Sequence, residues 1–252
     1  MFRLVSHCYI YGIIELENLV CSYSRRRTLA YRPLSALLLV LFVSVGPAKA
    51  EPPDESLLAF AVLIRQSAPQ NTIAGAGIYL GHGVFLTAAH VAGHTRLTRP
   101  KIASNDEEFP TWTVKEGSFE DTDLTLLSVG QDLLPMRFRL RSMKLCTTQP
   151  FPGEAVVTIV PGSAVRSQVL APARLPADLR RFATAIRDVA QTGNSGAGVF
   201  DVQQRCLLGI MSRKLSISRR ARGGGKPQLD DIGKYFVPAA EISAFLPAGL
   251  RF

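Results

Sequence analysis

The sequence contains few residues of the kinds that bind metal ions. Its 252 residues include four histidines and four cysteines, and neither set shows the close spacing of a metal site. The longest nearly apolar run, residues 34–45, has about a dozen residues, which is too short to span a bilayer comfortably. No internal repeat at a solenoid period is visible. We therefore expect neither a metalloprotein nor a repeat protein.

The charge and composition are those of an ordinary globular protein. The chain is 47% hydrophobic and 19% charged, with a formal net charge of +9. Residues 1–50 carry six basic and two acidic residues, so +5 remains on the rest of the chain. A charge of this size requires no nucleic-acid partner.

The first 50 residues predict a leader for export. Residues 25–32 are basic, residues 34–45 are nearly all apolar, and Ala48-Lys49-Ala50 has the small-x-small pattern of a signal-peptidase site. We expect cleavage after Ala50 and no stable membrane span afterwards, with an uncleaved anchor as the alternative. The first two dozen residues fit no signal peptide and are consistent with a start codon placed too far upstream. The folded domain is then expected at residues 51–252.

Two cysteines remain after such cleavage. Cys146 and Cys206 form an even pair in a chain bound for an oxidising compartment, which favours a disulfide bond. The alternative is two buried free thiols.

The rest of the chain is typical of an all-β protein. Short apolar runs alternate with Gly, Pro and Asn, which are strand and turn signals. The predicted strands are residues 57–65, 73–80, 84–88, 112–115, 123–129, 155–160, 168–171, 198–202, 206–213 and 235–237. Residues 179–186 are ambiguous, because their apolar residues fit both helical spacing and strand alternation.

A serine surrounded by glycines stands out in the second half. Ser195 lies between Gly193 and Gly196, two residues that let the backbone turn sharply and let a substrate carbonyl approach. The backbone N–H groups of Gly193 and Ser195 could then point at one spot beside the hydroxyl, as in an oxyanion hole. Such a stretch also forms ordinary turns, so this motif alone does not decide.

Two residues upstream could activate this serine, because a hydroxyl nucleophile needs a base and the base needs an orienting acid. His90 ends the apolar stretch of residues 84–89, and Asp123 precedes another apolar stretch. Each has a more ordinary interpretation, as a core histidine and as a turn aspartate. The three residues together favour a catalytic set.

At this point the chain resembles the trypsin-like (chymotrypsin-fold) serine proteases, and the bacterial, HtrA-type branch in particular. The motifs are Thr87-Ala88-Ala89-His90, Asp123-Leu124-Thr125-Leu126-Leu127 and Gly193-Asn194-Ser195-Gly196. Their order also argues against an α/β-hydrolase, in which the serine comes first and sits in Gly-x-Ser-x-Gly. We expect no PDZ domain in the remaining length.

This resemblance implies an all-β fold of two packed six-stranded antiparallel barrels with a short C-terminal helix. Barrel one is expected at about residues 56–130, barrel two at about 142–237 and the helix at 238–246. The active site would lie between the barrels, with His90 and Asp123 from the first barrel and Ser195 from the second.

The resemblance also implies the catalytic roles. His90 is the general base, Asp123 orients it, Ser195 is the nucleophile, and the N–H groups of Gly193 and Ser195 receive the oxyanion. The implied substrate is a polypeptide, and no cofactor or metal is required.

Three further residues are implied to bind the substrate. Val189 stands at the base of the specificity pocket, where an apolar side chain favours apolar residues before the cleaved bond. Ser212 and Lys214 lie on the strand expected to pair with the substrate. Lys214 either narrows the pocket or points to solvent.

Two functions remain open. One is a serine endopeptidase, periplasmic or secreted from a bacterium, and the other is a catalytically silent trypsin-fold protein that binds partners. The basic residues between Arg213 and Lys226 also have two interpretations, a solvated loop or a basic lip that attracts acidic substrates.

Overall fold

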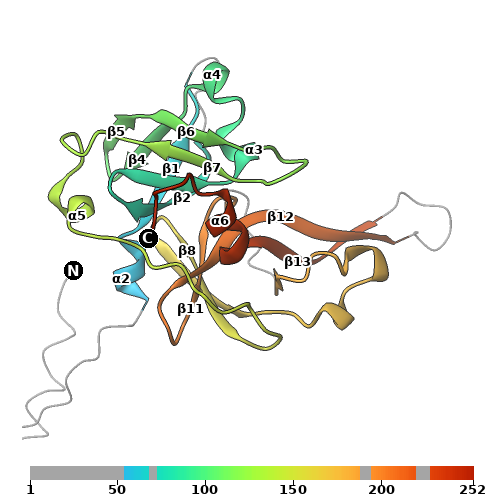
Figure 1. Ribbon diagram of the computed structural model, residues 1–252. Helices are drawn as coiled ribbons and strands as arrows, with labels where there is room; N and C mark the ends of the chain where they lie inside the picture. Colours follow the sequence, from blue (N-terminus) through green and yellow to red (C-terminus); the bar gives the residue numbers. More distant parts are fainter. Residues whose placement is uncertain (1–53, 68–72, 188–193, 220–227) are drawn as a thin grey trace, which may run out of the picture. The chain divides into compact units, whose positions relative to one another are not determined.

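The computed structural model describes residues 54–67, 73–187, 194–219 and 228–252 (Figure 1). The predicted leader, Val189, Gly193 and the basic residues 220–226 lie outside the described residues. In the described part, no helix is both long enough and apolar enough to cross a membrane.

The first sheet is antiparallel and has seven strands, in the order β5-β4-β1-β2-β3-β7-β6. Its strands are β1 (Ala61–Arg65), β2 (Ile73–Gly81), β3 (Val84–Thr87), β4 (Lys101–Ser104), β5 (Glu107–Pro110), β6 (Trp112–Glu116) and β7 (Thr125–Ser128). Three short helices accompany it, α3 (Ala89–Ala92), α4 (Thr95–Thr98) and α5 (Met136–Arg139), whose Phe138 packs on Tyr79 of β2.

The second sheet is antiparallel and has six strands, in the order β10-β13-β12-β11-β8-β9. Its strands are β8 (Ala155–Val160), β9 (Ser163–Gln168), β10 (Ala185–Ile186), β11 (Gly198–Asp201), β12 (Leu207–Arg219) and β13 (Gln228–Pro238). The helical segments that accompany this sheet are α2 (Glu55–Leu58), which contacts β8 and β9, η1 (Pro172–Arg174), η2 (Ala177–Leu179) and α6 (Ala239–Phe245). Figure 1 shows β12 and β13 as a long hairpin.

The central strands of the first sheet are buried on both faces, which explains their continuous apolar sequence. On β2, Ile78 and Leu80 pack in a core that also contains Val157, Val199 and Phe200 of the second sheet. Tyr79, which alternates with them, packs instead in a separate cluster on the other face. One hydrophobic core therefore joins the two sheets.

The predicted all-β fold with two β-barrel halves and a short C-terminal helix is confirmed. The first half differs in having seven strands instead of six, because β4 and β5 form a hairpin that the sequence did not suggest. In the ambiguous segment, η2 ends at Leu179 and β10 then pairs with β13. The strand interpretation is thus correct for Ala185 and Ile186.

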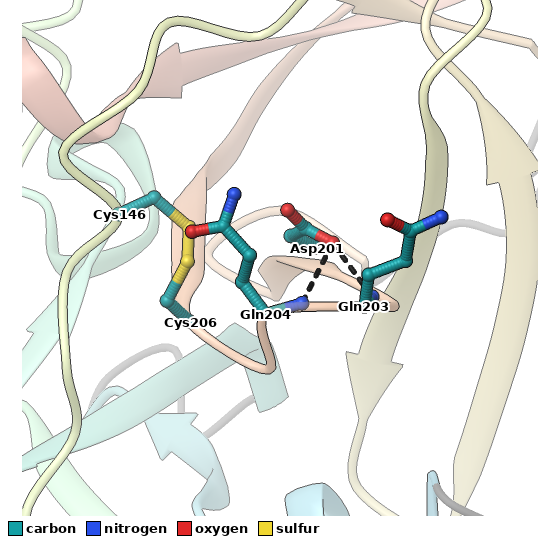
Figure 2. The surroundings of a disulfide bond; sticks show 5 residues. All are labelled: Cys146, Asp201, Gln203, Gln204 and Cys206. Atoms are coloured by element: carbon teal, nitrogen blue, oxygen red, sulfur yellow. Dashed lines mark hydrogen bonds between the residues drawn. A yellow bond between two sulfur atoms is a disulfide. The ribbon is translucent and has the colours of Figure 1, made fainter.

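Cys146 and Cys206 form a disulfide bond, as predicted (Figure 2). The bond connects the segment that precedes β8 to the turn between β11 and β12, and its Cα atoms lie 5.1 Å apart. Asp201 holds this turn, because its Oδ1 accepts hydrogen bonds from the backbone N–H groups of Gln203 at 2.6 Å and Gln204 at 3.0 Å (Figure 2). The bridge therefore ties two buried parts of the second half together.

Replacing both cysteines with serine should lower the free energy of unfolding by about 2–4 kcal/mol, because the unfolded chain regains the freedom that the crosslink removes. The crosslinked residues are 60 positions apart. Urea unfolding with and without reductant measures the effect. Reductant should destabilise the wild type and leave the double variant unchanged, whereas a wild type that does not respond would contradict the bridge.

Candidate active site

His90 lies at the turn that follows β3. All four residues of β3 are buried, and the chain leaves the sheet at Ala88 to form α3. Ala88 and Ala89 are buried, because their small side chains let this turn pack closely against the sheet. The His90 side chain is 31% exposed. The imidazole therefore stands on a rigid support and remains accessible.

Asp123 accepts hydrogen bonds from residues of both halves of the protein. It precedes β7, its side chain is 1% exposed, and its Oδ1 accepts the backbone N–H of His90 at 3.0 Å. His90 Nδ1 lies 2.9 Å from Oδ2 and 3.1 Å from Oδ1. The Ser212 hydroxyl, on β12, donates to Oδ2 at 2.5 Å. A carboxylate offers only acceptors, so Nδ1 carries the proton and Nε2 is left as the basic atom.

The Asp123 carboxyl is held in its charged form. Burial opposes ionisation, but the hydrogen bonds from the His90 ring, the Ser212 hydroxyl and the His90 backbone outweigh it and keep the pKa of Asp123 below its ordinary value of 3.8. Asp123 is therefore an anion beside His90 at neutral pH. It can orient the ring and stabilise a positive charge on it.

The backbone of Ser195 is docked onto β2 by contacts that only glycine permits. Ala76 N–H donates to Ser195 O at 2.8 Å, and Gly196 has a φ of +83°. A Cβ on Gly196 would lie 1.9 Å from Ala76 O, and one on Gly75 would lie 2.6 Å from Ser195 O and 2.8 Å from Val91 Cγ2. Because Val91 directly follows His90, these contacts bring the serine turn next to the histidine turn.

The Ser195 hydroxyl donates to Ser212 O at 3.4 Å. No hydrogen bond joins it to His90 within the part of the chain that the structure describes. Ser212 thus contacts Asp123 through its hydroxyl and Ser195 through its carbonyl oxygen. The Asp123 and Ser195 side chains therefore both lie beside β12.

The other predicted site residues have different outcomes. Val189 and Gly193 lie outside the described residues, and the pocket base and the oxyanion hole, including the part assigned to Ser195 N–H, stay predictions. The Lys214 side chain is 53% exposed, and its Nζ pairs with Asp231 Oδ2 of β13 at 2.7 Å. Lys214 therefore extends along the β12–β13 hairpin, and its contact with substrate stays a prediction.

Phe119, which the sequence pattern did not indicate, stands with its ring edge-on to His90, and the ring centroids lie 5.3 Å apart. The Arg213 guanidinium covers the Phe119 ring at 4.1 Å, and its Nη2 donates to Phe119 O at 2.7 Å. Phe119 comes from a polar stretch with no strand or helix period. Its position four residues before Asp123 is the only sequence signal that could have indicated it.

A second anchor holds the segment that follows His90. Glu116 of β6 accepts hydrogen bonds from the Thr95 hydroxyl, from Thr95 N–H at 3.3 Å and from His94 Nδ1 at 3.2 Å. The Thr95 hydroxyl contributes most to holding the pKa of Glu116 below its ordinary value. This carboxylate fixes α4 to the first sheet.

A polar cavity of about 280 Å³ opens beside Asp123. Residues of both halves line it: Glu120, Asp121, Asp123, Arg181, Phe182, Arg213, Tyr235, Val237 and Glu241. Burial, and then the charge of Glu241, raise the pKa of Tyr235 to about 12, so its hydroxyl stays protonated. Among the described side chains, no group of three His, Cys, Asp or Glu could hold a metal ion.

Solved structures that are similar to this chain in fold include several proteases. The active form of the Rv3671c protease from M. tuberculosis is 17% identical, with a TM-score of 0.53 over 88% of this chain and 92% of that one. The serine endoprotease from Yersinia pestis is 17% identical, with a TM-score of 0.51 over 76% and 63%. Kallikrein-related peptidase 10 is 18% identical, with a TM-score of 0.52 over 74% and 93%.

These similarities show the fold. The chain has the chymotrypsin fold of the trypsin-like serine proteases, as its motifs predicted. The sequence matches no protein-family model and none of the curated proteins.

Replacing Ser212 with alanine should destabilise the protein at neutral pH by about 1.5–3 kcal/mol, because it removes a donor to a buried charge. The folded pKa of Asp123 is lowered, so the stability from its ionised form is present above pH 3.8 and is lost as the pH falls through the folded pKa. The difference between wild type and Ser212→Ala should therefore narrow in acid. Urea unfolding from pH 7 to pH 2 measures it, and a difference that does not change over this range would contradict this account.

Proposed function

We propose that this protein is an exported serine endopeptidase that cuts peptide bonds through His90, Asp123 and Ser195. The observation that carries the proposal is the 2.9 Å contact between His90 Nδ1 and the buried Asp123 carboxylate, which Ser212 also holds. In a trypsin-like fold, this contact leaves His90 Nε2 as a base beside the turn that carries Ser195. The protease names of the similar structures agree with it.

The proposed reaction begins when His90 Nε2 takes the proton of the Ser195 hydroxyl. The oxygen attacks a peptide carbonyl, and Asp123 stabilises the imidazolium that results. The N–H groups of Gly193 and Ser195 receive the negative oxygen. His90 then gives its proton to the leaving amine, and water releases the acyl group from Ser195 by the same steps. No step needs a cofactor.

The substrate is proposed to be an extended polypeptide that lies along β12. After Met211, β12 pairs only with β13 in the described part, so the edge of Ser212 and Lys214 on the side of Ser195 has no strand partner there. An extended peptide can add to such an edge. With Val189 at the pocket base, we propose a preference for apolar residues before the cleaved bond.

Export is proposed from the leader and the disulfide. Residues 1–50 have the features of a cleaved signal, and the Cys146–Cys206 bond suits an oxidising compartment such as the periplasm or the exterior of a bacterium. The mature protein would then comprise residues 51–252.

One observation favours the alternative of a silent trypsin-fold binding protein. The Ser195 hydroxyl bonds Ser212 O, not His90. A site that kept this arrangement with substrate present would bind peptides without cutting them.

Labelling by a fluorophosphonate should separate the two functions. The enzyme predicts that Ser195 of the wild type reacts and that His90→Ala reacts about 10⁴-fold more slowly, since the base is lost. Mass spectrometry of the labelled peptide identifies the residue. A folded wild type whose Ser195 does not react would support the binding protein and refute the enzyme.

A further inference from the structure

Arg213 lies beside the proposed peptide path. It follows Ser212 on the part of β12 that pairs only with β13 among the described residues, and its guanidinium lies near two aromatic rings. The Phe119 ring lies 4.1 Å from its central carbon and the Phe182 ring 5.6 Å from it. One hydrogen bond, from Nη2 to Phe119 O at 2.7 Å, fixes its direction. This guanidinium is therefore pre-ordered, and the Arg213 side chain would lose little conformational entropy when a ligand binds it.

Arg213 differs from the neighbouring cations of β12 in having no ion pair among the described residues. Lys214 pairs with Asp231 at 2.7 Å, and Arg219 pairs with Asp230 at 2.5 Å. Arg213 Nε is shielded from solvent and has no hydrogen-bond partner. Glu120 and Asp121 line the same cavity but are exposed and form no ion pair with the guanidinium. Because Nη2 already donates to Phe119 O and Nε is shielded, Nη1 is the nitrogen for which the described residues provide no acceptor.

The strand geometry decides which substrate residue would meet this side chain. Ser195 Oγ lies 3.4 Å from Ser212 O, so the residue whose carbonyl is attacked lies next to Ser212. On an antiparallel partner, the preceding residue is then opposite Arg213, and directly opposite side chains project from the same face. That side chain would lie against Arg213, Phe119 and His90.

We propose that Arg213 binds the carboxylate of an Asp or Glu at the residue immediately before the one that Ser195 attacks. This inference rests on the proposed function for the path of the peptide. A rigid guanidinium and a carboxylate form paired, charge-assisted hydrogen bonds, which Gln at the same substrate position cannot reproduce. The substrate class is therefore a peptide with an acidic residue followed by an apolar one at the cleaved bond.

Binding to the Ser195→Ala variant tests this without cleavage. Two fluorescein-labelled peptides that differ only by Glu or Gln at that position are compared by anisotropy, and the Glu peptide should bind about tenfold more tightly. Because the change is in the peptide, the comparison does not depend on how a protein variant folds. A third peptide with the Glu moved one position toward its N-terminus should bind like the Gln peptide, since its side chain then projects from the other face.

The matched protein variants are Ser195→Ala with Arg213→Gln and Ser195→Ala with Arg219→Gln, which remove one positive charge each from β12. The first should lose the preference for Glu, and the second should keep it. Equal binding of the Glu and Gln peptides, absence of binding by both, or a preference that survives Arg213→Gln would overturn the inference. Cleavage of the Gln peptide by the wild type reports separately on the proposed protease, so the two proposals can fail independently.

Discussion

A buried carboxylate that accepts hydrogen bonds from both halves of the protein constrains the rest of the site. Asp123 belongs to the first half, where it accepts hydrogen bonds from the backbone N–H and the ring of His90. It also accepts a hydrogen bond from the Ser212 hydroxyl of β12. Removing such a charge from water is costly unless its acceptor sites are filled. The two halves must therefore meet in one register, and that register brings the Ser195 turn to the histidine turn.

The same register is maintained by backbone contacts that admit no side chain. Gly196 packs against Ala76 O, and Gly75 packs between Ser195 O and Val91. The shared hydrophobic core supplies most of the driving force for association of the sheets, but apolar packing has little directional preference. The glycine contacts and the hydrogen bond from Ala76 N–H to Ser195 O fix the orientation in which the two sheets associate. Core and site are thus parts of one interface.

The sequence predicted those features that depend on local pattern or on motif. The apolar strands were predictable. The family resemblance also pointed to His90, Asp123 and Ser195, and the structure shows the contact between His90 and Asp123. The hairpin of β4 and β5 was not predictable from the sequence. Its two strands are short, and residues 101–110 are mostly polar and end in proline. Arg213 appeared as one member of a basic run. Only the tertiary fold distinguishes Arg213 from its neighbours, because it brings Phe119, from the connection between β6 and β7, next to the guanidinium.

The position of the proton on the His90 ring tests the central claim most directly. In wild-type protein labelled with ¹⁵N-histidine, NMR should show a proton on Nδ1 at neutral pH, with a resonance shifted far downfield by its hydrogen bond to Asp123. Asp123→Ala should lose that resonance while the fold persists. A wild-type His90 that carries its proton on Nε2 would contradict the account, because its basic nitrogen would then face Asp123 and not Ser195.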